Sequence, residues 1–266
     1  GGFIGMMVKD TYDAQNQNAF VSGLNALRSN FESETGSDFT EASAADRLAF
    51  LNKLQKNNDR DWFNANKDEY LRCHENMIGF ADNLLQKMNK HDNIENQNGK
   101  KCLHRIYRDT RFSKDKTPYK SNFSGGFKRA TQSLRGGYYF HIQPGNCFLG
   151  GGFWGPNSED LKRIREEIDL NSDEFYGIFN SKKFKATFGE IRGERLKTSP
   201  KGFDKDHPAL DLLQLKQFIV KKNFTDQEVL SENFADEANE VFKNMRPFFD
   251  FMSITLTTNS NGESIL

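Results

Sequence analysis

The chain contains 266 residues with 37 basic and 37 acidic side chains, so its formal net charge is zero. That balance excludes a uniformly basic nucleic-acid-binding coat and an acidic solvating tail. The 25 Phe residues supply enough apolar surface for a packed core, which excludes disorder along the whole chain. We find no apolar run near the roughly 18 residues of a membrane helix and no signal-peptide pattern, so we expect no membrane partner.

Cysteine and histidine usage favours a reducing compartment. The three Cys residues, Cys73, Cys102 and Cys147, are odd in number and too widely spaced for a Cys-x-x-Cys motif. The five His residues form no His-x-x-x-His pair. We therefore expect three free thiols, a cytoplasmic protein and no metal site, and nothing in the sequence indicates a cofactor.

The N-terminal region differs from the rest of the chain. Apolar residues recur at helical spacing between Phe20 and Phe31, and a polar linker covers Ser33 to Ala45. We predict that residues 1–42 form an appendage of one helix and this linker, that residues 43–252 form a single domain and that residues 253–266 form a tail.

Helical periodicity dominates both ends of the predicted domain. Apolar spacing predicts helices over Ala44 to Lys56 and over Arg60 to about Asn89, with Asn58 or Asp59 as the N-cap of the second. The C-terminal third contains five predicted elements: a helix capped by Asn157 or Ser158, short helices at Ser172–Asn180 and Lys182–Phe188, a strand at Lys216–Lys221, and a final helix from about Ser231.

The middle third changes to short aromatic segments bounded by Gly or Pro. Four strands are predicted, at Leu103–Phe112, Phe123–Phe127, Tyr138–Gln143 and Cys147–Trp154. The turn residues Pro144, Gly145 and Asn146 predict a hairpin between the last two, and hairpins imply antiparallel pairing. Helices, then strands, then helices indicate an α+β fold, with an antiparallel or mixed central sheet flanked by N- and C-terminal helices.

A dense cationic segment interrupts the overall charge balance. Between Lys100 and Arg129 there are ten Lys or Arg residues and two Asp residues. If Leu103–Phe112 is a strand, Arg105, Asp109 and Arg111 share one face, and Asp109 orients the two guanidinium groups. The cations of the predicted anion site are Arg105, Arg108, Arg111, Lys114, Lys116 and Lys120.

The predicted catalytic residues are Asp109, which orients the cations, and Tyr119 and His141, which are the candidate proton-transfer groups. His141 shares a strand face with Tyr139. For His141, a structural hydrogen-bonding role is about as plausible as an acid-base role. The run Gly150–Gly152 fits a bulge or tight packing better than a phosphate-binding loop, because no Gly-Lys-Ser/Thr follows it. Helix capping is the favoured role of Asn58 and its neighbours.

Four strings carry a resemblance to a known family: NNDRDWFNANKDEY from Asn57, RIYRDTRFSKDKTPYKSNF from Arg105, YYFHIQPGNCFLGGGFW from Tyr138 and SPKGFDKDHPALDLLQLKQF from Ser199. In that order they resemble the domain-of-unknown-function family numbered twenty-four sixty-one, a group of uncharacterised bacterial and fungal proteins. The resemblance covers about Ala45 to Phe249. It implies a domain boundary and no mechanism.

Three functional hypotheses follow from the cationic segment. The first is a binder of a compact phosphate- or carboxylate-bearing ligand, with or without acid-base chemistry. The second is a nucleic-acid-binding module in which the same cations follow a backbone and aromatic rings stack on bases. The third is a protein-interaction scaffold whose charges are structural. Zero net charge and the short extent of the segment favour a compact anion over a long polyanion.

Overall fold

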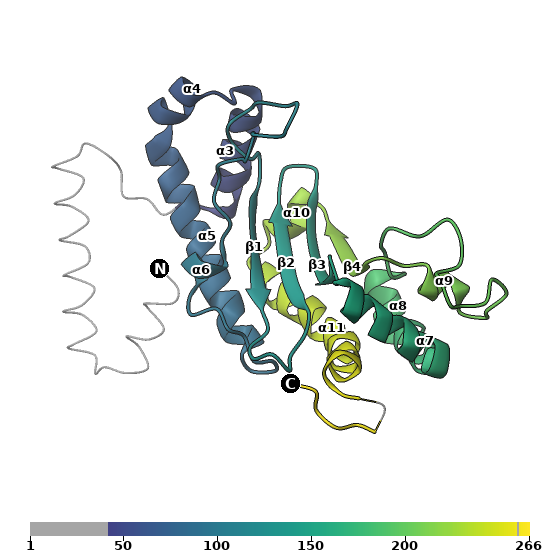
Figure 1. The fold of residues 1–266 in the computed structure, drawn as a ribbon. Coiled ribbons are helices and arrows are strands. Elements are labelled where there is room, and N and C mark those ends of the chain that lie inside the picture. Colours follow the sequence, from purple (N-terminus) through teal and green to yellow (C-terminus); the bar gives the residue numbers. More distant parts are fainter. Residues whose placement is uncertain (1–41, 260) are drawn as a thin grey trace, which may run out of the picture.

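The computed structural model describes residues 42–259 and 261–266. The predicted appendage at 1–42 therefore lies outside the described residues, except for Ala42. The described chain begins with the helices α3 (Ala44–Lys56), α4 (Arg60–Ala65), α5 (Lys67–Met88) and α6 (Gly99–Cys102) (Figure 1). The helix predicted at Ala44 is confirmed, and Ser43 and Asp46 form a capping box at its start.

The prediction of one continuous helix from Arg60 is wrong in one respect. The chain breaks at Asn66, where φ is −113° and ψ is 20°, and this residue separates α4 from α5. The side chain of Asn66 donates a hydrogen bond to the carbonyl of Trp62 at 2.8 Å. A local side-chain bond of this kind competes with the helical ladder, which explains an interruption that apolar periodicity alone does not reveal.

The sheet has four antiparallel strands in the order β1 (Phe123–Lys128), β2 (Gly137–Ile142), β3 (Cys147–Phe153) and β4 (Phe218–Phe224). These match four of the five predicted strands, including the one predicted from Lys216. The predicted hairpin between β2 and β3 is also present, and Gly145 adopts a positive φ of 72° in its turn.

The strand predicted over Leu103–Phe112 is wrong. The segment forms only isolated bridges, which join Leu103 to Gly125 and Tyr107 to Tyr119. Beyond Tyr107 the chain bonds to its own side chains, because Asp109 accepts from the backbone N–H of Arg111 at 3.2 Å. Such local bonds take the place of a strand ladder.

The C-terminal half contributes α7 (Ser158–Phe179), α8 (Lys182–Phe188), α9 (Leu210–Leu213), α10 (Asp226–Val229) and α11 (Phe234–Thr257). The helix predicted at Ser172–Asn180 is the last part of α7, beyond a kink at Asn171. The proposed domain end at residue 252 falls inside α11, and Leu256 beyond it is buried.

The hydrophobic core lies between one face of the sheet and the helices packed on it. Side chains alternate along β2, so Tyr138, Phe140 and Ile142 are buried, whereas Tyr139 and His141 on the other face are half-buried. Helix α5 packs against β1 and helix α11 against β3 (Figure 1). The fold is therefore α+β, as predicted, and the face with Tyr139 and His141 is the open face of the sheet.

Candidate functional site

The predicted cationic segment forms a loop between α6 and β1, which we call the cationic loop (residues 103–122). Its two arms are joined around the bridge of Tyr107 and Tyr119, where the backbone N–H of Arg108 donates to Pro118 at 2.9 Å. The N–H of Lys120 donates to the carbonyl of Ile106 at 2.8 Å. Ile106 and Tyr119 are buried, so the arms are anchored and residues 109–117 form the tip.

Carboxylates within the tip engage two of the six predicted cations. Arg111 donates hydrogen bonds to the Asp109 carboxylate through Nε at 3.0 Å and Nη2 at 2.6 Å. This pairing lowers the pKa of Asp109. Arg108 donates through Nη1 to both Asp115 and Thr117. The backbone N–H of Thr117, followed by Arg108, lowers the pKa of Asp115 to about 2. Asp109 thus orients Arg111, whereas its predicted bond to Arg105 is not formed.

The lysines of the loop differ in their hydrogen bonds. Lys116 donates to the carbonyl of Thr110 at 2.8 Å, and Lys120 donates to the carbonyl of Arg105 at 2.9 Å. Lys114 makes no hydrogen bond or ion pair with any described residue. The side chain of Phe112, at the tip, is 97% exposed. The loop therefore retains cationic groups that its own residues do not neutralise.

A pocket of about 280 Å³ lies where the cationic loop meets α4, and we call it the loop pocket. Its lining consists of Arg60, Asn64, Tyr107, Arg108, Thr110, Pro118 and Tyr119. Two guanidinium groups and no carboxylate belong to this lining. Arg108 is held through Nη1 only, and its Nε and Nη2 form no hydrogen bond with any described residue. That leaves two donor nitrogens, with three N–H groups, on a positioned Arg.

Asn58 connects the loop pocket to the start of α4. Its side chain accepts from the N–H of Tyr119 at 3.0 Å and donates to the carbonyl of Tyr119 at 2.9 Å. Asp59, rather than Asn58, caps α4 by accepting from the N–H of Trp62 at 2.8 Å. The capping role predicted for Asn58 is therefore wrong, because both atoms of its amide are committed to a residue 61 positions away.

The three predicted catalytic residues do not converge. Tyr119 lines the loop pocket, and its ring stacks on Phe63 with centroids 3.9 Å apart. Burial raises the pKa of Tyr119. Asp109 belongs to the loop tip and does not line the pocket. His141 projects from β2 onto the open face of the sheet.

His141 belongs to a short chain of polar contacts on that open face. Its Nδ1 lies 2.9 Å from Tyr139 Oη and its Nε2 lies 3.0 Å from Gln143 Oε1. With Nε2 protonated and donating to Gln143, Nδ1 accepts from the Tyr139 hydroxyl. Burial lowers the pKa of His141. A neutral His141 between two partners fits the structural reading as well as the acid-base reading.

A second pocket, of about 780 Å³, hollows the open face, and we call it the sheet pocket. Aromatic rings from Tyr139, Phe148 and Trp154 line it, together with three lysines, Lys101, Lys128 and Lys221. His104 also lines this pocket, and burial followed by the charge of Lys120 lowers the pKa of His104.

The glycine run after Leu149 has two roles. Gly150 lines the sheet pocket, as do Gly126 and Gly137. Gly151 faces the core, where an added Cβ would lie 2.5 Å from Met245 Sδ. At Gly152 a Cβ would lie 2.1 Å from the carbonyl oxygen of Phe218. The predicted tight packing therefore holds for Gly151 and Gly152, while Gly150 opens the sheet surface.

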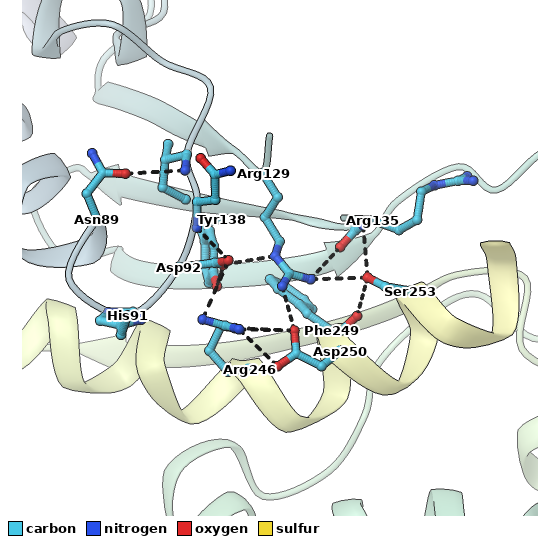
Figure 2. A network of polar contacts seen from close by, with 12 residues as sticks. Asn89, His91, Asp92, Arg129, Arg135, Tyr138, Arg246, Phe249, Asp250 and Ser253 are labelled. Carbon is cyan, nitrogen blue, oxygen red and sulfur yellow. Dashed lines mark hydrogen bonds and ion pairs between the residues drawn. The ribbon is translucent and has the colours of Figure 1, made fainter. Parts of the chain in front are cut away.

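A buried ion network joins α11 to the segment before α6 and to the end of β1 (Figure 2). Arg129 donates to Asp92 at 2.8 Å and to Asp250 at 2.5 Å, and Tyr138 donates to Asp92 at 2.5 Å. Arg246 contacts both carboxylates, at 3.0 Å from Asp250 and 3.5 Å from Asp92. Sequence reasoning missed this network. The available signal was the pair Arg246 and Asp250, four residues apart and flanking Phe248 and Phe249 in α11.

Within residues 42–259 and 261–266, no group of three or more His, Cys, Asp or Glu side chains is placed to hold a metal ion. None of the helices in the described part of the chain combines the length and apolar character needed to cross a membrane.

Comparison with known proteins gives one match. No curated protein and no solved structure matches the chain. The model of a conserved hypothetical protein family, DUF2461, matches residues 46–251, which include every described strand, both pockets and the cationic loop. Because the match covers most of the chain, and agrees with the resemblance found in the sequence, this protein is a member of the DUF2461 family.

Proposed function

We propose that this protein binds a compact anion of the phosphate or carboxylate class in the loop pocket, between Arg60 and Arg108. The observation that carries the proposal is that two Arg residues line one small pocket whose lining contains no Asp or Glu. Arginine presents a planar set of donors that matches the oxygens of phosphate and carboxylate groups. Desolvation of an anion there is offset by the charge of Arg60 and by the donor nitrogens of Arg108 that Asp115 does not engage.

Preorganisation supports binding at this place. Asp115 and Thr117 hold Arg108 through a single nitrogen, so its remaining donors are oriented before a ligand arrives. Asn58 holds the backbone of Tyr119, which also lines the pocket. A pocket whose walls are fixed in the free protein loses less conformational entropy on binding.

The remaining predicted cations have a supporting role in this proposal. Arg105, Lys114, Lys116 and Lys120 add a positive potential around the pocket without lining it, and they raise the local concentration of an anion. Acid-base chemistry is a further part of the hypothesis. Of Asp109, Tyr119 and His141, only Tyr119 lines the pocket and can share a proton with a ligand bound there.

Phosphate binding tests the proposal. Inorganic phosphate should raise the melting temperature of the full chain above that in chloride at matched ionic strength, because it binds the native state. Phosphate also stabilises proteins generically, by exclusion from their surface. Arg60→Gln should remove the specific part and weaken phosphate binding in calorimetry by about tenfold, which corresponds to about 1.4 kcal/mol.

Arg163→Gln is the matched control, because it removes the same charge from α7, where Arg163 pairs with Glu159. It should respond to phosphate as the parent does. If Arg60→Gln also responds as the parent does, the loop pocket is not the anion site. A loss confined to the double variant Arg111→Ala with Lys116→Ala would place the anion at the loop tip instead.

The salt dependence separates this function from nucleic-acid binding. A single compact ligand held by two Arg side chains releases few counterions, so its affinity should fall gently with added salt. A backbone bound along the whole cationic loop would give a steep logarithmic slope. We expect the gentle slope, because the loop tip already pairs Arg108 and Arg111 with carboxylates.

A further inference from the structure

The sheet pocket is separate from the loop pocket and shares no lining residue with it. Its floor follows from strand register. On the open face, Tyr139 of β2 is paired with Gly126 of β1 and with Gly150 of β3. Gly126 leaves the β1 side of the Tyr139 ring without a side chain, whereas ring atoms of Trp154 and Phe148 lie 3.9 and 4.0 Å from where a Cβ of Gly150 would stand.

The same absence of side chains recurs one step along the strands. Gly137 is paired with Lys128 on β1 and with Gly152 on β3. A Cβ added to Gly137 would meet its nearest heavy atom, the carbonyl oxygen of Phe127, at 3.5 Å, which is ordinary contact. The backbone therefore does not require glycine here for space, and the missing side chain enlarges the pocket.

Aromatic rings form the walls of the pocket. Trp154 approaches Tyr139 edge to face, with centroids 6.2 Å apart, and its side chain is 43% exposed. Phe148 packs against Tyr139 at 5.7 Å. The rings of Tyr139 and Trp154 beside a glycine floor favour a flat ligand, because a ring gains dispersion and edge-to-face contacts with them.

The Lys, Arg, Asp and Glu residues in the pocket lining are all lysines. Lys101, Lys128 and Lys221 belong to its lining, and no Asp or Glu does. Lys128 is paired with Glu95 at 2.7 Å, whereas Lys101 and Lys221 form no ion pair with any described residue. Lys221 lies with its Nζ 3.9 Å from the centroid of Phe148, which places a positive charge on the aromatic wall.

We propose that the sheet pocket is a second binding site, which takes an organic anion with a flat ring. The ring lies over Gly126 beside Tyr139 and Trp154, and the acid group faces Lys221 and Lys101. The volume of about 780 Å³ suits a small-molecule ligand. This inference goes beyond the compact anion proposed for the loop pocket and does not depend on it.

Single-stranded nucleic acid fits this surface less well. His141 stacks on Phe148 with centroids 4.8 Å apart, and Lys221 also engages that ring. Phe148 is therefore occupied by its own neighbours and does not offer a free face to a base. A pocket ligand needs only the space beside Tyr139 and Trp154.

The test uses the full chain and 2-naphthoate, which carries two fused rings and one carboxylate. Calorimetry should show binding of 2-naphthoate, with at least tenfold weaker binding of 2-naphthol, which lacks the carboxylate, and of acetate, which lacks the rings. Lys221→Met should weaken 2-naphthoate binding by about tenfold. Lys222→Met is the matched control, since register places Lys222 with Leu149 on the other face of the sheet.

A second variant tests the pocket by filling it. Gly137→Val places a branched side chain where contact with the backbone is ordinary, and it should reduce 2-naphthoate binding at least tenfold without lowering the melting temperature. Arg60→Gln should leave 2-naphthoate binding unchanged, and Lys221→Met should leave phosphate binding unchanged. The two sites therefore succeed or fail separately.

Three results would overturn the inference. The first is absence of 2-naphthoate binding by the parent chain. The second is equal weakening by Lys221→Met and Lys222→Met, which would place the ligand elsewhere. The third is tight binding of a twelve-nucleotide oligothymidine that Lys221→Met weakens while 2-naphthoate does not compete, which would make the open face a nucleic-acid surface.

Discussion

Arg129 Nε donates to Asp92 Oδ2 at 2.8 Å, and the two side chains are 0% and 1% exposed. The pair joins residues 37 positions apart and lies next to α11 (Figure 2). Arg129 also donates to Ser253 Oγ at 3.2 Å and to the carbonyl of Arg135 at 3.1 Å. A buried guanidinium with this many acceptors holds three segments together, and its stability depends on each acceptor.

Removing the charge of Asp92 should destabilise the fold severely. Asp92→Asn leaves Arg129 buried with a weakened partner, and breaking a buried pair in this way costs about 3–5 kcal/mol. Urea unfolding measures the change. Asp250→Asn is the control, because the Asp250 side chain is 44% exposed and water can replace it. Equal, small losses in both variants would show that the network does not hold the fold.

The two hydrogen bonds between the Asn58 side chain and the Tyr119 backbone should contribute about 2–4 kcal/mol to the free energy of unfolding. Asn58→Ala removes both bonds and leaves a backbone N–H and a carbonyl without these partners. Asn58→Asp keeps the acceptor and loses the donor, so it should lie between the parent and Asn58→Ala. Urea unfolding orders the three proteins. If Asn58→Ala is as stable as the parent, these two hydrogen bonds do not stabilise the fold.

Lowering the pH should reduce the free energy of unfolding, in part because His141 becomes protonated. Burial lowers the pKa of His141 from its ordinary value of 6.5, so the folded state binds this proton less tightly than the unfolded chain. Its contribution is present above pH 6.5 and is lost as the pH falls through the folded-state pKa. His141→Gln should show a smaller drop in unfolding free energy between about pH 7.5 and 5.

His74 and His104 share this direction, because burial lowers the pKa of each. The His141→Gln variant should therefore lose only part of the pH dependence. Urea unfolding at both pH values measures it. An unchanged drop would mean that the folded state protonates His141 as readily as the unfolded chain does.

The three cysteines should be reduced and slow to react. Burial raises the pKa of Cys73 to about 11, of Cys102 to about 12 and of Cys147 to about 11, so little thiolate is present near neutral pH. Ellman's reagent should label the native protein slowly and find three thiols after denaturation without reductant. A single thiol under denaturing conditions would reveal a disulfide.

The end of α11 should be part of the stable domain. A chain that stops after Met252 loses Ser253, whose Oγ accepts from the N–H of Arg135 at 2.9 Å, and it loses the buried Leu256. It should melt at a much lower temperature than the parent, whereas a chain that stops after Thr258 keeps the helix and should melt near the parent. Equal melting of both shortened chains would support the domain end proposed at residue 252.

The sequence alone determined most of the secondary structure. The helix from Ala44, the strands near Phe123, Tyr138 and Cys147, and the turn at Gly145 depend on caps, alternation and turn residues that act within a few positions. The class of the fold follows from the order of these elements. The family was also identified from short strings of residues, and its model matches 46–251.

Only the tertiary structure decided which polar groups meet. Asn58 reaches Tyr119 across 61 positions, and Arg129 reaches Asp250 across 121 positions. The sheet pocket depends on register, which sets Gly126 and Gly150 beside Tyr139. Local propensity acts over one turn of helix or one strand, whereas these contacts are selected by the packing of the whole chain. The cationic segment was therefore visible in the sequence, but the pairing of its charges was not.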